Sequence, residues 1–234
     1  MWERWSRQVG VDTCCAGRRS DRLRSFAARR PSMPDSSSAS TPSGTRATGK
    51  VKGTLLLARL KYLEAQGPER AGRVVRHLSK ADQEALRGIV LQSGWYPADL
   101  LLRLEMTAAA ILSNGDRIRL FLDMGRFSAA TNLGPAGVQR AFVREGDPQR
   151  FLADVPRMYS SQHSSGRRVH EATGERAALV RTFGDEEIVA EDCLTTVGWL
   201  QHAIELCGGR GVSVVETRCR SRKAECCEFR CEWQ

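Results

Sequence analysis

The C-terminal segment constrains the fold more than any other part of the chain. Residues 227–233 read CEFRCEW, in which apolar and charged side chains alternate. Because alternate side chains of a strand lie on opposite faces, the pattern predicts a strand over Glu225–Trp233 with one apolar face. The face toward the core is expected to carry Cys227, Phe229, Cys231 and Trp233, and the other face Cys226, Glu228, Arg230 and Glu232.

The segment before this strand predicts a helix and a second strand. Cys193, Val197, Leu200, Ile204 and Cys207 recur at spacings of three and four, which places them on one face of a helix over Glu191–Leu206. Gly208-Gly209 ends that helix. A β-like run over Val212–Cys219 and a basic turn then complete a C-terminal hairpin.

The preceding part of the chain is predicted to be mostly helical. Apolar spacing and turn residues predict helices over about 50–66, 69–78, 80–91, 97–114, 116–130, 135–144 and 148–160, with a turn at Trp95-Tyr96-Pro97. Two short strands over Arg167–His170 and Arg176–Thr182 are expected to form a hairpin. The predicted fold class is α+β, a helical N-terminal part packed on a small antiparallel sheet that ends in the C-terminal β-hairpin.

Residues 1–49 are expected to be a disordered tail rich in arginine and serine, because no apolar period persists there. Two interpretations of residues 1–32 stay open: a misassigned start, with Met33 as the natural one, or a targeting peptide. Residues 50–234 are expected to form a single ligand-binding-like domain. The sequence itself leaves open whether residues 1–32 belong to the natural protein.

Charge and hydropathy exclude several classes of protein. The net charge is +9, but residues 1–32 hold eight arginines against three acids, so more than half of the excess lies in the tail. Nucleic-acid binding is therefore not expected, since a binder needs its charge on a folded face. No apolar run is long enough to span a bilayer, and no secretory signal is visible. We expect a cytoplasmic protein with reduced thiols.

The cysteines of the last 42 residues are candidate metal ligands. Cys227 and Cys231 are four residues apart on one strand, about 13 Å, which is too far for one zinc ion. Cys219 and Cys227 face each other across the predicted hairpin and could bind zinc or form a disulfide. Small buried core thiols are the alternative interpretation. The arginines around Cys219 also make it the candidate reactive thiol.

The same residues resemble a known signature. Cys219, seven further residues and Cys227-Glu228-Phe229, preceded by VSVVE, are similar to the C-terminal signature of 4-vinyl-reductase-type domains. Lys223 departs from that signature, which usually has glycine in the turn. Residues 50–234 more specifically resemble a paralogous family of uncharacterised proteins from myxobacteria. The residues that carry this second resemblance are Lys52-Gly53-Thr54, Trp95-Tyr96-Pro97, Gly198-Trp199-Leu200 and the closing CEFRCEW.

The resemblance implies a relation to ligand-binding folds that include haem nitric-oxide sensors and vesicle-tethering subunits, with a pocket between helices and sheet. Its walls would come from Leu100–Ile111 and Cys193–Cys207. Haem sensors have a histidine after a motif similar to Phe151–Met158, but here the next residue is Tyr159. Haem is therefore not expected, although tyrosine can ligate haem iron.

Three functions remain open. The sequence favours a small-molecule-binding or sensory and regulatory domain whose ligand, small or lipid-like, is unidentified. The alternatives are a protein-interaction scaffold, such as a homodimer, and a thiol-based redox or metal sensor. We do not expect an enzyme, because no nucleophile elbow, phosphate-binding loop or zinc-protease motif is present.

Overall fold

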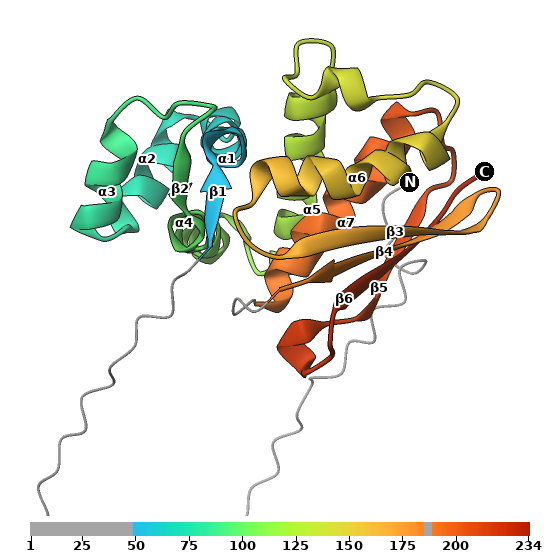
Figure 1. Ribbon diagram of the computed structural model, residues 1–234. Helices are drawn as coiled ribbons and strands as arrows, with labels where there is room; N and C mark the ends of the chain where they lie inside the picture. The colour runs from blue at the N-terminus through green and yellow to red at the C-terminus, as the bar shows by residue number, and fades with distance from the viewer. Residues whose placement is uncertain (1–48, 185–188) are drawn as a thin grey trace, which may run out of the picture. The chain divides into compact units, whose positions relative to one another are not determined.

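The computed structural model describes residues 49–184 and 189–234, in which helices pack beside an antiparallel sheet (Figure 1). The tail expected over residues 1–49 thus lies outside the described residues, apart from Gly49. The predicted α+β class is confirmed, with most of the helices before the strands of the main antiparallel sheet and one long helix between its two hairpins. Among the described residues, no helix combines the length and the apolar character needed to cross a membrane.

The N-terminal helices pack around a shared apolar core. They are α1 (Gly53–Ala65), α2 (Pro68–His77), α3 (Lys80–Arg87) and α4 (Ala98–Leu112). Leu56, Leu104 and Phe121 are almost completely buried in this core. The Ser79 hydroxyl accepts a hydrogen bond from the Asp82 backbone N–H at 3.1 Å, as expected of the N-cap of α3.

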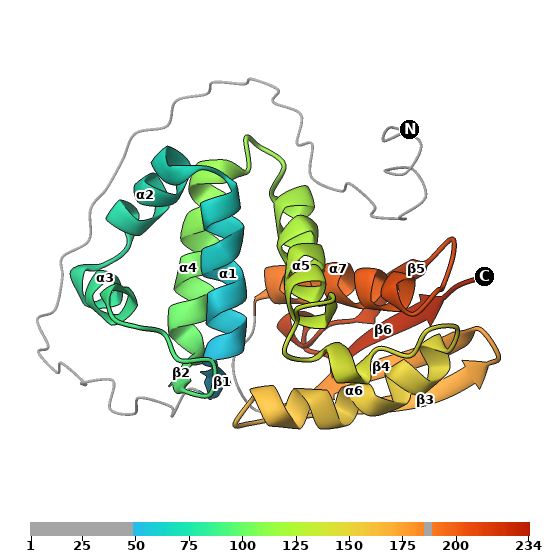
Figure 2. The same ribbon diagram turned by 90° about the horizontal axis from the view of Figure 1, so that it is seen from above.

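Two glycines let α5 (Arg117–Leu133) and α7 (Ala190–Leu206) pack at very short distance (Figure 2). A Cβ atom on Gly125 would lie 2.1 Å from the Thr195 carbonyl oxygen, and one on Gly198 would lie 2.1 Å from the Leu122 carbonyl oxygen. Side chains cannot approach backbone atoms so closely, so both positions require glycine. This crossing fixes where α7 lies relative to the helical part.

The main sheet has four antiparallel strands in the order β3-β4-β6-β5. They are β3 (Arg167–Gly174), β4 (Ala177–Phe183), β5 (Ser213–Arg218) and β6 (Cys227–Glu232). Helix α6 (Pro148–Gln162) packs mainly along β3, and α7 packs against β5 and β6 (Figure 2). Both predicted hairpins are present, so the C-terminal strands and α7 form one layered region.

Two local predictions are wrong. No α-helix forms over residues 135–144, where only a short 3₁₀ turn, η1 (Arg140–Phe142), is present. Pro135 and Gly137 explain the difference, because both residues disfavour a continuous helix. Trp95–Pro97 is a short strand, β2, which pairs antiparallel with β1 (Lys50–Lys52) instead of forming a turn.

Candidate metal centre

Four side chains from three elements converge between α7 and the C-terminal hairpin. Cys193 lies in the first turn of α7, Glu216 in β5, Cys219 directly after β5, and Cys227 at the start of β6. One donor atom from each residue lies within 4.8 Å of those of the other three. The three cysteines are almost completely buried, and all six cysteines of the described residues are free thiols.

A β-bulge brings Glu216 and Cys219 to the same face of the sheet. Three residues apart on a regular strand, their side chains would lie on opposite faces. The register instead shifts between Glu216, which pairs with Phe229, and Arg218, which pairs with Glu228. The extra residue, Thr217, turns its hydroxyl outward to the Glu228 carboxylate at 2.7 Å. The bulge thus restores Cys219 to the inner face.

The same register explains why Cys219 and Cys227 meet. The strand ends at Arg218, one residue earlier than predicted, but the pairing Arg218↔Glu228 places Cys219 and Cys227 at the next opposed position. Cys219 keeps an extended backbone, with φ −139° and ψ 129°. The predicted approach of these two residues across the hairpin therefore follows from the register, whereas metal binding stays a prediction.

One oxygen of Glu216 has no hydrogen-bond partner in the described part of the chain. Its Oε2 accepts a hydrogen bond from Arg222 Nη2 at 2.9 Å. Its Oε1 is shielded from solvent and unpaired. A buried carboxylate oxygen without a partner is costly. A cation bound among the thiols would supply the missing partner.

The local electrostatics shift the pKa values of Cys227 and Cys193 in opposite directions. The pKa of Cys227 is lowered to about 6, because the Cys193 thiol donates a hydrogen bond to it and the Arg220 backbone N–H and guanidinium stabilise the thiolate. The pKa of Cys193 is raised well above its usual value by the same hydrogen bond, by burial and by the Glu216 carboxylate. The prediction of Cys219 as the reactive thiol stays a prediction, and the structure adds Cys227, whose pKa is lowered, as a second candidate. Arg220 of the basic turn therefore lowers the pKa of Cys227.

The sequence missed two of the four residues. Cys193 was assigned only to the apolar face of its helix, and Glu216 was given no role. The Cys193 and Cys219 sulfur atoms lie 3.7 Å apart, far longer than a disulfide bond. No sequence spacing reveals this contact, because it depends on how α7 packs on the hairpin.

The outer face of β6 also differs from the prediction. Cys226 and Glu228 were expected on a charged, exposed face, but Cys226 is 3% and Glu228 8% exposed. Arg181 and Thr217 cover Glu228 and donate hydrogen bonds to it, and these bonds lower its pKa. Cys207 and Cys231 are buried and lie outside the group of four, as small core residues do.

Comparison with known proteins relates the C-terminal half to a family and the described unit to a fold. The model of a family described as "Protein of unknown function (DUF2378)" matches residues 120–234, which include all four residues of the candidate centre. A comparison with curated proteins finds no match. The fold resembles that of H-NOX proteins.

Three solved structures illustrate the likeness. The H-NOX protein of K. algicida in its Fe(II) unliganded state has 13% identity and a TM-score of 0.55, over 78% of this chain and 96% of that one. The H-NOX protein of S. oneidensis in the Fe(II)NO ligation state has 14% identity and a TM-score of 0.57, over 78% and 99%. A structure concerned with heme distortion in the H-NOX family has 10% identity and a TM-score of 0.58, over 78% and 95%. At these identities the likeness shows the fold alone.

The expected relation to haem-sensor-like folds is thus confirmed at the level of fold, and a match to an uncharacterised family is confirmed for residues 120–234. The resemblances to 4-vinyl-reductase-type domains and to a myxobacterial family stay predictions.

The residues at the position of the haem-sensor histidine do not fit a haem ligand site. Tyr159, which stands there, is buried, and its ring stacks on His163 with centroids 4.0 Å apart. The Arg168 guanidinium lies over the same ring at 4.7 Å. Burial and this guanidinium lower the pKa of His163 to about 4. The position is a packed aromatic stack beside a cation, so we derive no chemistry through haem.

Proposed function

We propose that the chain is a small-molecule-binding sensory domain whose C-terminal half is stabilised by a structural zinc ion at Cys193, Glu216, Cys219 and Cys227. The observation that carries the proposal is the convergence of these four donor atoms within 4.8 Å. Cys219 and Cys227 are the ligands that the sequence predicted, and Cys193 and Glu216 complete the set.

The geometry and chemistry of the donors favour zinc. Two sulfur ligands of one tetrahedral zinc ion, each about 2.3 Å from it, lie about 3.8 Å apart. The Cys193–Cys219 separation of 3.7 Å agrees with that distance. Thiolates are soft ligands that select zinc over magnesium or calcium. The pKa of Cys227, lowered to about 6, favours the thiolate form that binds metal ions.

A structural role is favoured over a catalytic one. Four protein donors complete a tetrahedral zinc site, whereas catalytic zinc keeps one position for water or substrate. The cysteines are nearly inaccessible to solvent. The ion would join the start of α7 to both strands of the last hairpin, so the proposal assigns no enzymatic activity to this site.

The sensory part of the proposal is supported by the fold. H-NOX structures of similar fold are described in Fe(II) and Fe(II)NO states, so this fold accommodates small ligands in those proteins. Reduced thiols as metal ligands are consistent with the cytoplasm. A homodimer and a docking scaffold remain alternative roles for the same domain.

A thiol redox sensor is the second candidate. Cys227 combines a pKa of about 6 with a neighbouring thiol, Cys193, a combination typical of redox-active pairs. Bound zinc and a disulfide are mutually exclusive here, because both need the same sulfur atoms. The two candidates therefore differ in metal content and in the mass of the non-reduced protein.

Metal analysis of the purified full chain tests the proposal. We expect one zinc per chain in the wild type and loss of zinc in Cys227→Ala. Cys231→Ala is the matched control, because Cys231 lies on the same strand, is equally buried and is outside the group. Retention of zinc by Cys227→Ala, or a zinc-free wild type with an oxidised cysteine pair, would overturn the structural-zinc assignment.

A further inference from the structure

A groove of about 450 Å³ lies between the start of α1 and the end of α6. Its lining comes from β1 and α1, the loop before β2, the η1 segment and α6. The volume is that of a site for a small metabolite. The helices around Leu100–Ile111 and Cys193–Cys207, which the sequence suggested as pocket walls, do not line it.

The walls of the groove are joined by backbone hydrogen bonds. The Gly53 and Thr54 N–H groups donate to the carbonyl oxygens of Gly94 and Gln92 at 2.9 and 3.2 Å. The Ser164 N–H, just beyond α6, donates to the Lys50 carbonyl at 2.9 Å. These contacts connect β1, α1 and α6 before any ligand arrives. The site is therefore largely preformed.

The lining carries positive charge without a carboxylate. Lys52 and Arg157 are its charged residues, and it contains no aspartate or glutamate. Within the described residues, neither cation forms an ion pair. The Lys52 ammonium donates to the Ser93 carbonyl at 2.8 Å and lies over the Trp95 ring at 4.1 Å. The Arg157 guanidinium lies over Phe142, 5.2 Å from the ring centroid.

A polar group of the lining also has no partner. Gln162 Oε1 is shielded from solvent and accepts no hydrogen bond from the described residues. Its amide nitrogen makes one weak contact, to Ser161 Oγ at 3.3 Å. Gln139, another residue of the lining, is only 7% exposed. The lining thus combines two cations with glutamine amides.

We propose that this groove binds a small anionic metabolite, whose phosphate or carboxylate group contacts Lys52 and Arg157 and whose polar body donates a hydrogen bond to Gln162. Guanidinium and ammonium groups form their strongest hydrogen bonds with such anions. Val138 and Phe142 supply the apolar part of the lining. This inference rests on the small-molecule part of the proposed function and is independent of the metal.

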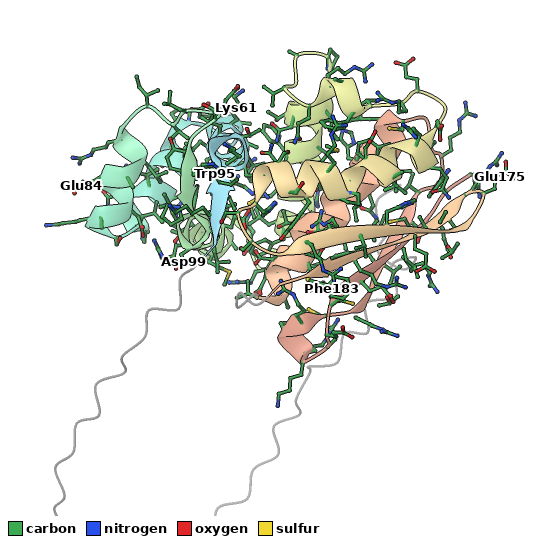
Figure 3. All side chains as sticks on the ribbon, in the orientation of Figure 1. Lys61, Glu84, Trp95, Asp99, Glu175 and Phe183 are labelled. Carbon is green, nitrogen blue, oxygen red and sulfur yellow. The ribbon has the colours of Figure 1, made fainter. Side chains whose placement is uncertain are left out.

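Tryptophan fluorescence of the purified full chain provides the test, because Lys52 lies directly over Trp95, which is labelled in Figure 3. The probes are AMP, citrate and uncharged adenosine. We expect saturable binding of AMP, of citrate or of both, and much weaker binding of adenosine. A response to AMP alone assigns a phosphate ligand, and a response to citrate alone assigns a carboxylate.

Two matched variants locate the binding. Arg157→Gln should weaken anion binding about tenfold or more, since it removes a charge-assisted contact. Arg150→Gln, on the same helix but outside the lining, should change it less than twofold at constant ionic strength. Equal effects of both variants, or no saturable binding of either anion, would overturn the inference. Zinc content measured on the same samples separates this failure from failure of the metal proposal.

Discussion

Asp82 has a role in two elements at once. Its backbone N–H is capped by Ser79, while its side chain, only 7% exposed, accepts hydrogen bonds from Arg103 Nε and Nη2 at 2.9 and 2.8 Å. The Arg103 guanidinium on α4 holds the pKa of this carboxyl below its usual 3.8. A helix of only eight residues, α3, is thereby attached to α4 by a bidentate ion pair.

We expect Asp82→Asn to lower the free energy of unfolding by about 1 kcal/mol at pH 7, after allowing for the half-exposed Arg103. A group with a lowered folded-state pKa stabilises fully above its unfolded pKa and loses this contribution as pH falls through the folded-state value. The difference between wild type and variant should therefore shrink below pH 3.8. Urea titrations at several pH values measure it.

Asp99→Asn is the matched control for this prediction, because Asp99 approaches the same arginine at 4.0 Å but is 45% exposed. Its loss should cost less than about 0.5 kcal/mol. Equal costs for the two variants would show that the bidentate contact is not the stabilising feature.

At the same scale, the sequence predicted half of the candidate metal centre. Alternation in β6 and an eight-residue spacing were sufficient to pair Cys219 with Cys227. Cys193 and Glu216 could not be predicted in this way. The position of Cys193 depends on helix packing, and that of Glu216 depends on a bulge that no residue pattern predicts.

The close packing of α5 on α7 depends on two glycines, Gly125 and Gly198, which have no side chain. Gly198→Ala would place a methyl group 2.1 Å from the Leu122 carbonyl oxygen, a backbone atom that cannot move without shifting α5. Alanine favours a helix by about 1 kcal/mol over glycine, but the clash should dominate. We expect a net loss of about 2–3 kcal/mol in the free energy of unfolding, measured by urea denaturation.

Gly72→Ala in α2 is the matched control. A Cβ atom there would meet only the mobile end of Arg76, at 3.0 Å. This variant should keep or raise stability, by up to about 1 kcal/mol. A stable Gly198→Ala protein would mean that the two helices separate more easily than their contact suggests.

Helices and strands were predicted best where a regular apolar pattern extends over many residues. Helix α7 and strand β6 lie close to their expected ranges, because their buried faces repeat regularly. The segment 135–144 looked helical by composition alone, and Pro135 with Gly137 prevented the helix. The strand Trp95–Pro97 depends on its partner β1, which is distant in sequence and therefore could not be inferred.

The whole described unit contains two regions that the candidate zinc should affect differently. The first is the helical core of α1, α2 and α4, which contains no candidate ligand. The second is the start of α7 with β5 and β6, which together with Cys219, directly after β5, supply the four candidate ligands. Metal binding adds to the folding free energy, and we expect its effect to be largest in the segments that supply the ligands.

Amide hydrogen exchange with and without zinc tests this division. After zinc removal by a chelator, we expect faster exchange in residues 190–196, 213–219 and 226–231, because local opening no longer requires loss of the metal. Exchange in α1 and α4 should stay nearly unchanged. Cys227→Ala should reproduce the pattern, whereas Cys231→Ala should retain zinc-dependent protection. Uniform acceleration across all helices would contradict the division and would indicate that the unit unfolds as a single cooperative whole.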